Sequence, residues 1–167
     1  MIFKSTKHKS DLYNILLTLS RNIFFYKKIK LYDTFETRIY LMFFHFAILM
    51  IISKKKGTKF DQNNYDYLFN NIENNLRELG FGDVTVNKKM KELNKILYDI
   101  LLKIEVINPN VNEFAVKSTI VKKYFKELEN SKNSDLSELS SYFTGFFDFC
   151  FELPLNNMVR DAINYKY

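Results

Sequence analysis

The sequence has few of the residues that bend or end secondary structure. Its 167 residues include 4 glycines, 2 prolines and no tryptophan. Gly and Pro mark the tight turns of β-rich folds and interrupt helices, so their scarcity favours a helical fold. The single cysteine, Cys150, excludes an intramolecular disulfide. Its apolar neighbours in "FFDFCFEL" predict a buried thiol without a nucleophilic role.

Motifs that bring catalysis or metal binding are also absent from the sequence. There is no Gly-rich phosphate loop, HExxH, GxSxG or CxxC. With His8 and His45 as the two histidines, no Cys/His cluster suggests a zinc site, and we expect no metal and no cofactor. No recognisable nucleic-acid-binding module appears, and we expect no DNA partner. A non-enzymatic binding protein is favoured; an enzyme would need a deep polar pocket beside His45.

What the chain does contain is ample material for one core. Hydrophobic residues make up 47%, with 17 Phe and 11 Tyr. A chain of this length is the size of one domain and buries about two-thirds of its unfolded surface. The sequence therefore predicts a globular domain over residues 10–167.

Positive charge is concentrated at the start of the chain. Residues 1–32 hold seven Lys or Arg and one acid, Asp11, whereas the remainder holds 18 basic and 18 acidic residues. We expect a basic leader over 1–9, with no apolar segment of a secretory signal, and Asp11 argues against a mitochondrial presequence. The basic segment suits an acidic membrane surface or RNA, or it is a solvated helix face.

The longest apolar run extends from Ile39 to Ile52 and is interrupted by His45 alone. As a helix these residues span roughly 21 Å, whereas a bilayer core needs about 30 Å. A helix that is apolar on all sides usually lies at the centre of a globular core; interfacial insertion and a true span are the alternatives. For His45 we predict a buried, hydrogen-bonded role, with a ligand or proton-transfer role as the alternative.

Hydrophobic periodicity predicts an all-α, single-domain bundle of about six or seven helices around a central apolar helix at about 34–54. Ser10, Asp33, Asp61 and Asn112 stand where helix caps belong, and Glu36 completes a capping-box-like pair with Asp33. Gly80 suits the position just after a helix. The other helices are expected at residues 10–28, 61–79, 83–104, 112–128 and 135–152, with a short one after Pro154.

Three stretches, in this order and spacing, resemble the ubiquinol–cytochrome c chaperone family: Leu12–Met50, Asn71–Asp99 and, more weakly, Asn112–Phe143. The most specific features are "DTFETR" before the apolar run with His45, and "LRELGFGD" followed by "VNKKMK". The part after about Phe143 does not align. The resemblance implies a helical, non-enzymatic assembly factor for cytochrome b, the membrane subunit of ubiquinol–cytochrome c reductase.

The matching residues supply the candidate client-binding positions Asp33, Arg38, Arg77, Glu78, Gly80, Gly82, Asp83, Lys88 and Lys89, and the structural core positions Phe35, His45, Leu76 and Met90. Each candidate also has a structural reading. Asp33 suits a cap, and Arg38 an ion pair. The polar loop from Arg77 to Asp83 suits either a binding contact or a capping turn, and the lysines suit a basic edge or a solvated face.

The resemblance also implies partners and a location. Cytochrome b, or its nascent form, is the expected client, with a small partner subunit, the ribosome and a peripheral membrane contact as further expectations. A bacterial member acts in the cytoplasm or at the inner face of the inner membrane, and a eukaryotic one in the mitochondrial matrix. The alternative function is a basic membrane-surface or RNA/ribosome-associated adaptor that uses residues 1–32.

Overall fold

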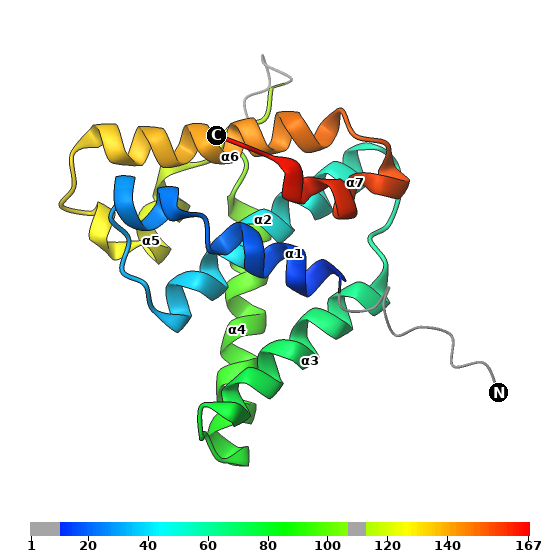
Figure 1. Cartoon of the computed structure of the whole chain (residues 1–167), viewed down its shortest axis with the longest axis vertical. Helices are drawn as coiled ribbons and strands as arrows, with labels where there is room; N and C mark the ends of the chain where they lie inside the picture. Colours follow the sequence, from blue (N-terminus) through cyan, green and yellow to red (C-terminus); the bar gives the residue numbers. More distant parts are fainter. Residues whose placement is uncertain (1–10, 107–112) are drawn as a thin grey trace.

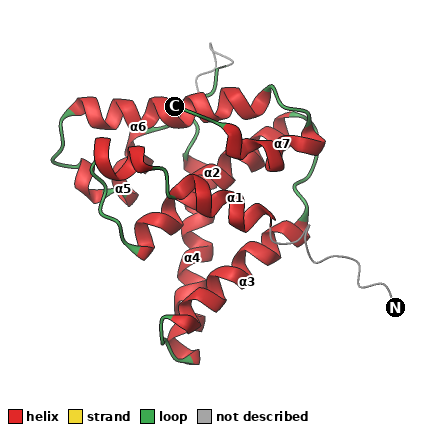
Figure 2. Ribbon diagram, viewed as in Figure 1, coloured by secondary structure: helices red, strands yellow, loops and turns green. Residues whose placement is uncertain are grey.

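The computed structural model describes residues 11–106 and 113–167. Over these residues the chain forms helices joined by loops, with no strand among its named elements (Figure 2). The α-helices are α1 (Asp11–Ser20), α2 (Phe35–Lys55), α3 (Gln62–Glu78), α4 (Asp83–Lys103), α5 (Ser118–Tyr124), α6 (Asn133–Phe151) and α7 (Leu155–Asp161). Short turns are η2 (Phe24–Lys28, π), η3 (Lys126–Leu128, 3-10) and η4 (Ala162–Asn164, 3-10). The all-α prediction is confirmed.

Helix α2 is the centre of the bundle, as its apolar sequence predicts. It contacts α1, α4, α6 and α7, and its residues from Leu41 to Leu49 are all buried. By length and composition α2 would suit a membrane span, with a mean hydropathy of 1.6, yet 67% of that apolar window is buried inside the protein. Burial by neighbouring helices is what a central core helix requires.

The other helices surround α2 on several sides (Figure 1). Helix α6 runs along one end of the molecule, and α1 crosses over α2. Helices α3 and α4 form an antiparallel hairpin that projects away from the opposite end. The two helices of this hairpin pack on each other, and the Tyr65 hydroxyl of α3 donates to Asn94 Oδ1 of α4 at 2.5 Å. Its tip, at Leu79–Gly82, is therefore the part of the hairpin farthest from α6.

The start of α2 corrects one prediction. Its cap is Thr34, whose Oγ1 accepts a hydrogen bond from the Thr37 amide at 3.1 Å. Asp33 does not cap the helix and forms no capping box with Glu36. Instead Asp33 accepts two hydrogen bonds from Arg38, at 2.7 and 2.9 Å. The predicted ion pair of Arg38 is thus confirmed, and it occupies the carboxylate that capping would need.

Two other caps follow the sequence prediction. Asp61 caps α3 by accepting from the Asn63 amide at 3.0 Å. Gly80 has φ +93° just after the end of α3, in the left-handed region where a side chain is disfavoured. The predicted caps Ser10 and Asn112 lie outside the described residues. The α3–α4 hairpin therefore begins and turns where its sequence indicates.

The prediction of one continuous helix over residues 10–28 is wrong, because the helix is interrupted after Ser20. Helix α1 ends at Ser20, whose hydroxyl donates back to the Leu17 carbonyl at 2.7 Å. Asn22 then accepts a hydrogen bond from the Phe24 amide at 3.0 Å, and the π turn follows. Apolar residues recur across this break, so periodicity alone does not reveal it. Side-chain hydrogen bonds to the backbone compete with the helix at this point.

The helix expected from Asn112 begins later, at Ser118. Before it, Val116 forms an isolated antiparallel bridge with Glu105, and the Lys117 amide donates to the Ile104 carbonyl at 2.7 Å. Phe114 stacks on Phe147 of α6, with ring centroids 4.2 Å apart. Pairing with the residues just after α4 and burial of Phe114 thus hold the residues before Ser118 extended. Neither interaction depends on the helix propensity of these residues.

Candidate functional site

The turn between α3 and α4 gathers most of the predicted client-binding residues. The Arg77 guanidinium donates to Glu73 of its own helix at 2.9 Å and also pairs with Asp83 at the start of α4. Gly80 supplies the left-handed turn, and Gly82 is the residue before α4. Arg77, Gly80, Gly82 and Asp83 therefore form a capping turn, which is the structural reading of this motif. Client binding by them stays a prediction.

Apolar side chains are exposed beside this turn. Leu79 is 59% exposed, Val84 is 85% exposed and Phe81 is 38% exposed. The ammonium group of Lys89 lies 4.8 Å from the Phe81 ring centroid, a cation–π contact. Lys88 is exposed on the same helix. The tip of the hairpin is thus an apolar surface with basic residues next to it.

One hollow, here called the hairpin groove, lies between the hairpin and the helices α1 and α2. Its volume is about 450 Å³. Its lining is Tyr13, Leu17, Arg21, Phe35, Arg38, Ile39, Met42, Asn75, Glu78 and Leu79. The fold therefore brings Glu78, at the end of α3, next to Phe35 and Arg38 in the first turns of α2. Most of the remaining lining is apolar.

The four predicted core positions divide into two pairs. His45 and Leu76 are fully buried, as expected. Phe35 and Met90 are half-buried and pack against the core. Phe35 lines both the hairpin groove and a smaller neighbouring hollow of about 180 Å³, which also includes Lys89. Phe35 is thus an edge residue between the core and the surface hollows.

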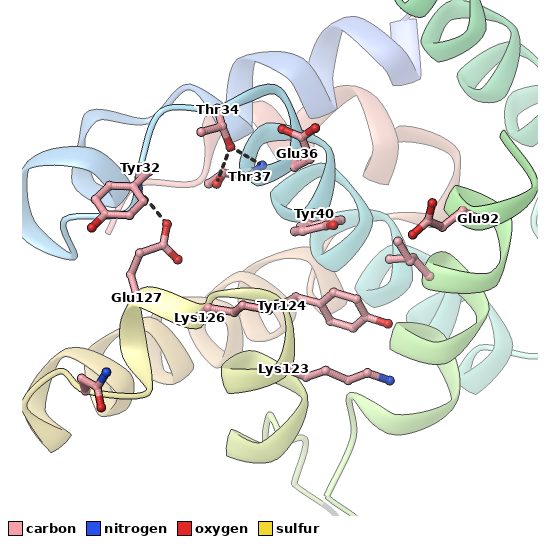
Figure 3. A pocket seen from close by; sticks show the side chains of 12 residues that line it. Tyr32, Thr34, Glu36, Thr37, Tyr40, Glu92, Lys123, Tyr124, Lys126 and Glu127 are labelled. Atoms are coloured by element: carbon pink, nitrogen blue, oxygen red, sulfur yellow. Dashed lines mark hydrogen bonds between the residues drawn. The ribbon is translucent and has the colours of Figure 1, made fainter. Parts of the chain in front are cut away.

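A larger hollow, here called the tyrosine groove, opens on the other side of the first turns of α2 (Figure 3). It measures about 950 Å³ and lies between α2, α4 and the segment from α5 to η3. Its lining is Tyr32, Thr34, Glu36, Thr37, Tyr40, Glu92, Ile96, Lys123, Tyr124, Lys126, Glu127 and Asn130. None of these residues is among the predicted site positions. The rings of Tyr40 and Tyr124 meet in it, with centroids 5.2 Å apart.

Asp99, a partly buried carboxylate on α4, holds α5 in place at one side of the tyrosine groove. It accepts hydrogen bonds from the Lys123 ammonium at 2.6 Å and the Tyr124 hydroxyl at 2.5 Å, and it also pairs with Lys103. Partial burial opposes its ionisation, but these donors outweigh that effect and hold the pKa of Asp99 well below its usual range. Burial and the nearby Asp99 raise the pKa of Tyr124. Asp99 therefore stays ionised and anchors α5 to α4.

His45 lies away from both grooves, inside the core. Its Nδ1 is 2.6 Å from the Leu41 carbonyl, so it carries the proton and donates, and Nε2 accepts from the Tyr142 hydroxyl at 2.9 Å. Burial lowers the pKa of His45 to about 4, against the opposing effect of the Leu41 hydrogen bond. Its surroundings are the rings of Phe25, Phe143 and Phe146. The predicted buried, hydrogen-bonded role is confirmed.

The remaining sequence candidates show no reactive arrangement. Cys150 is buried, and burial raises the pKa of its thiol to about 12. In the described part of the chain no group of three or more His, Cys, Asp or Glu could hold a metal ion. Of the basic N-terminal segment, Lys28 pairs with Glu138 at 2.5 Å, and residues 1–10 lie outside the described range. A membrane or RNA role of residues 1–32 stays a prediction.

An enclosed apolar helix, with open hollows at one of its ends, defines an all-α domain built around a central core helix. The sequence model of the ubiquinol–cytochrome C chaperone family matches residues 27–143, well over half of the chain, and the chain belongs to this family. Membership indicates a non-enzymatic role in the assembly of ubiquinol–cytochrome c reductase. No curated protein and no solved structure matches the chain significantly. The matched range includes the whole lining of the tyrosine groove.

Proposed function

We propose that this protein binds cytochrome b, complete or nascent, while ubiquinol–cytochrome c reductase is being assembled. The observation that carries the proposal is the family match over residues 27–143. An assembly chaperone has to hold apolar segments of its client before they reach their final partners. Exposed apolar surface next to a hollow is the feature that such binding requires.

The hairpin groove is the surface that suits an apolar client segment best. Leu17, Ile39 and Met42 line it, and the exposed Leu79 stands at its edge. Ile39 and Met42 form its buried floor, so Leu17 and Leu79 offer most of the accessible apolar surface. Arg21 and Arg38 border the same hollow and supply donors for polar groups of the bound segment. We therefore place the client contact between the hairpin tip and the first half of α2.

The proposed location follows from the client. A protein that receives a membrane subunit during synthesis works at the cytoplasmic face of the inner membrane in a bacterium, or at the matrix face in a mitochondrion. A small partner subunit and the translating ribosome are further proposed contacts. The exposed apolar tip of the hairpin, with Lys88 and Lys89 beside it, is compatible with peripheral membrane contact.

The proposal is tested by crosslinking on membranes followed by affinity purification of this protein. We expect cytochrome b in the purified material, and a Leu79→Asp variant should recover much less of it. Leu102→Asp is the matched control, because Leu102 is also exposed, at 79%, but lies at the far end of α4 from the hairpin groove. Absence of cytochrome b, or equal loss in both variants, would contradict the proposal.

A genetic readout complements the purification. Deleting the gene should lower assembled cytochrome b and leave unrelated membrane enzymes at their normal levels. Restoring the gene with the Leu102→Asp change should restore cytochrome b, whereas Leu79→Asp should not. Normal cytochrome b in the deletion strain would exclude the proposed role.

A further inference from the structure

The tyrosine groove has a surplus of carboxylates along its walls. Glu36 projects from the first turn of α2, Glu92 from α4, and Glu127 from η3 (Figure 3). Among the described residues Glu36 and Glu92 have no ion-pair partner. Glu127 accepts one hydrogen bond, from the Tyr32 amide at 3.1 Å. Each carboxylate therefore keeps acceptor oxygens available to a ligand.

The cations of this groove compensate these charges incompletely. Lys123 is bound to Asp99, which lies outside the groove lining. Lys126 is the one lysine of the lining that forms no ion pair in the described part of the chain. The lining thus holds three carboxylates and two ammonium groups, and the Asp99 carboxylate that binds Lys123 is shared with Lys103. Lys89 lines the neighbouring hollow with Glu36 and Glu92 but forms no ion pair with them. The groove is negative overall, although residues 1–32 make the whole chain basic.

Aromatic rings form the inner surface between the carboxylates. Tyr40 and Tyr124 are half-buried, with their rings tilted by 59° to each other. Burial raises the pKa of Tyr40, and the nearby Glu36 and Glu92 raise it further. Glu36 and Glu92 line the same hollow as this ring. An aromatic face close to carboxylates attracts an ammonium or guanidinium group by cation–π and ionic contacts together.

We propose that the tyrosine groove binds a basic loop segment of the membrane-protein client and holds its Lys or Arg side chains between Tyr40, Glu36 and Glu92. The inference rests on the proposed function. Loops of membrane proteins on the cytoplasmic side carry an excess of Lys and Arg, so a client at that face presents such segments. The volume of about 950 Å³ accommodates several side chains. Nucleic acid is disfavoured, because phosphates and these carboxylates repel each other.

The two grooves would then recognise different parts of one client. Phe35 lies on the hairpin groove, and Glu36, the next residue, lies on the tyrosine groove. The client would place an apolar segment on one side of α2 and a basic loop on the other. This order matches the end of a transmembrane helix, where apolar residues are followed by charged ones. The start of α2 would separate these two contacts.

The direct test is fluorescence anisotropy with labelled short synthetic peptides that tile the cytoplasm-facing loops of cytochrome b. We expect the basic peptides to bind the full-length protein and the neutral and acidic ones not to bind. The double variant Glu36→Gln, Glu92→Gln should weaken binding by about tenfold or more, and added salt should weaken it in the unaltered protein. Glu129→Gln is the control, because Glu129 is exposed and lies outside the groove lining. Unchanged affinity in the double variant would overturn the proposal.

A charge exchange tests the direct contact. The variant Glu36→Lys, Glu92→Lys should lose the basic peptide and gain a peptide of the same sequence with its Lys and Arg changed to Glu. Failure to gain the acidic peptide, with a circular dichroism spectrum showing a folded variant, would overturn the assignment. The basic leader of this chain could itself occupy the groove and compete with the peptides. A full-length variant with Lys4, Lys7 and Lys9 changed to Ser tests this. If that variant binds the peptides about tenfold more tightly, the leader is the occupant and the proposal is overturned.

The outcomes separate this inference from the proposed function. If the glutamate variants bind peptides normally while Leu79→Asp still lowers the recovery of cytochrome b, the groove assignment is wrong and the client assignment holds. If cytochrome b is not recovered with the unaltered protein, the client assignment itself is wrong, whatever the peptides show.

Discussion

The hydroxyl group of Tyr142 donates a hydrogen bond to Nε2 of His45 across 2.9 Å and so joins α6 to the centre of α2. Both side chains are completely buried. The Nδ1 proton of the same ring goes to the Leu41 carbonyl, so both nitrogens of His45 are satisfied. A buried polar group is stable only when it has such partners, and this pair fixes the register of α6 on α2.

Removing the Tyr142 hydroxyl should destabilise the protein more than its loss of contact area implies. In Tyr142→Phe the acceptor Nε2 of His45 stays buried without a partner, which costs about 1–3 kcal/mol. We expect urea unfolding to show that Tyr142→Phe lowers the free energy of unfolding by this amount. The double variant Tyr142→Phe, His45→Leu should be less destabilised than the sum of its single variants. Additive losses would show that the hydrogen bond contributes little.

Acid should weaken the fold through His45. Burial lowers the pKa of His45 to about 4 in the folded protein, against 6.5 for an exposed histidine. Because the unfolded chain binds this proton first, stability is full above pH 6.5 and falls as the pH drops toward 4. The loss from this residue is at most about 3 kcal/mol. Urea unfolding across this range should show the decline, and His45→Leu should flatten it; an unchanged slope would contradict the assignment.

Two neighbouring substitutions show whether Thr34 or Asp33 caps α2. Thr34→Ala removes the hydrogen bond to the Thr37 amide and should lower the free energy of unfolding by about 1 kcal/mol. Asp33→Ala should cost less, because Asp33 makes an exposed ion pair with Arg38 and leaves the helix amides untouched. Thermal unfolding of both variants provides the measurement. A larger loss for Asp33→Ala would restore Asp33 as the cap.

The two glycines of the α3–α4 turn should respond differently to alanine. Gly80 has φ +93°, so Gly80→Ala should lower the free energy of unfolding by about 1 kcal/mol or more. Gly82 has φ −74° and open space where a Cβ would point, so Gly82→Ala should be nearly neutral. Urea unfolding of the pair separates the two positions. Equal effects would mean that the turn differs from the one described.

The helices that periodicity located well are those with one strong apolar stripe. Helices α3 and α4 begin and end within a few residues of their prediction, because Asp61, Gly80 and Asp83 supply local signals there. The break after Ser20 and the late start of α5 have other causes. The first depends on side-chain hydrogen bonds to the backbone, and the second on the bridge between Glu105 and Val116. Tertiary pairing of this kind leaves no trace in local periodicity.

The site was predictable only in part. Phe35, Arg38 and Glu78 came from the family resemblance, and the fold places all three on the hairpin groove. The tyrosine groove was missed, because Tyr40 and Tyr124 are distant in the sequence and meet through the packing of α2 on the α5 segment. The i, i+4 spacing of Glu36 and Tyr40 on one helix face was a signal. That spacing alone does not distinguish a binding surface from a solvated one.

Site-specific photocrosslinking tests the central claim most directly. A photoreactive phenylalanine analogue would replace Leu79, at the edge of the hairpin groove, and in a second protein would replace Leu102, at the far end of α4. After irradiation of intact cells, mass spectrometry identifies the attached peptides. We expect cytochrome b peptides on the residue 79 analogue and not on the residue 102 analogue. Attachment of unrelated proteins at position 79, or of cytochrome b at position 102 alone, would contradict the account.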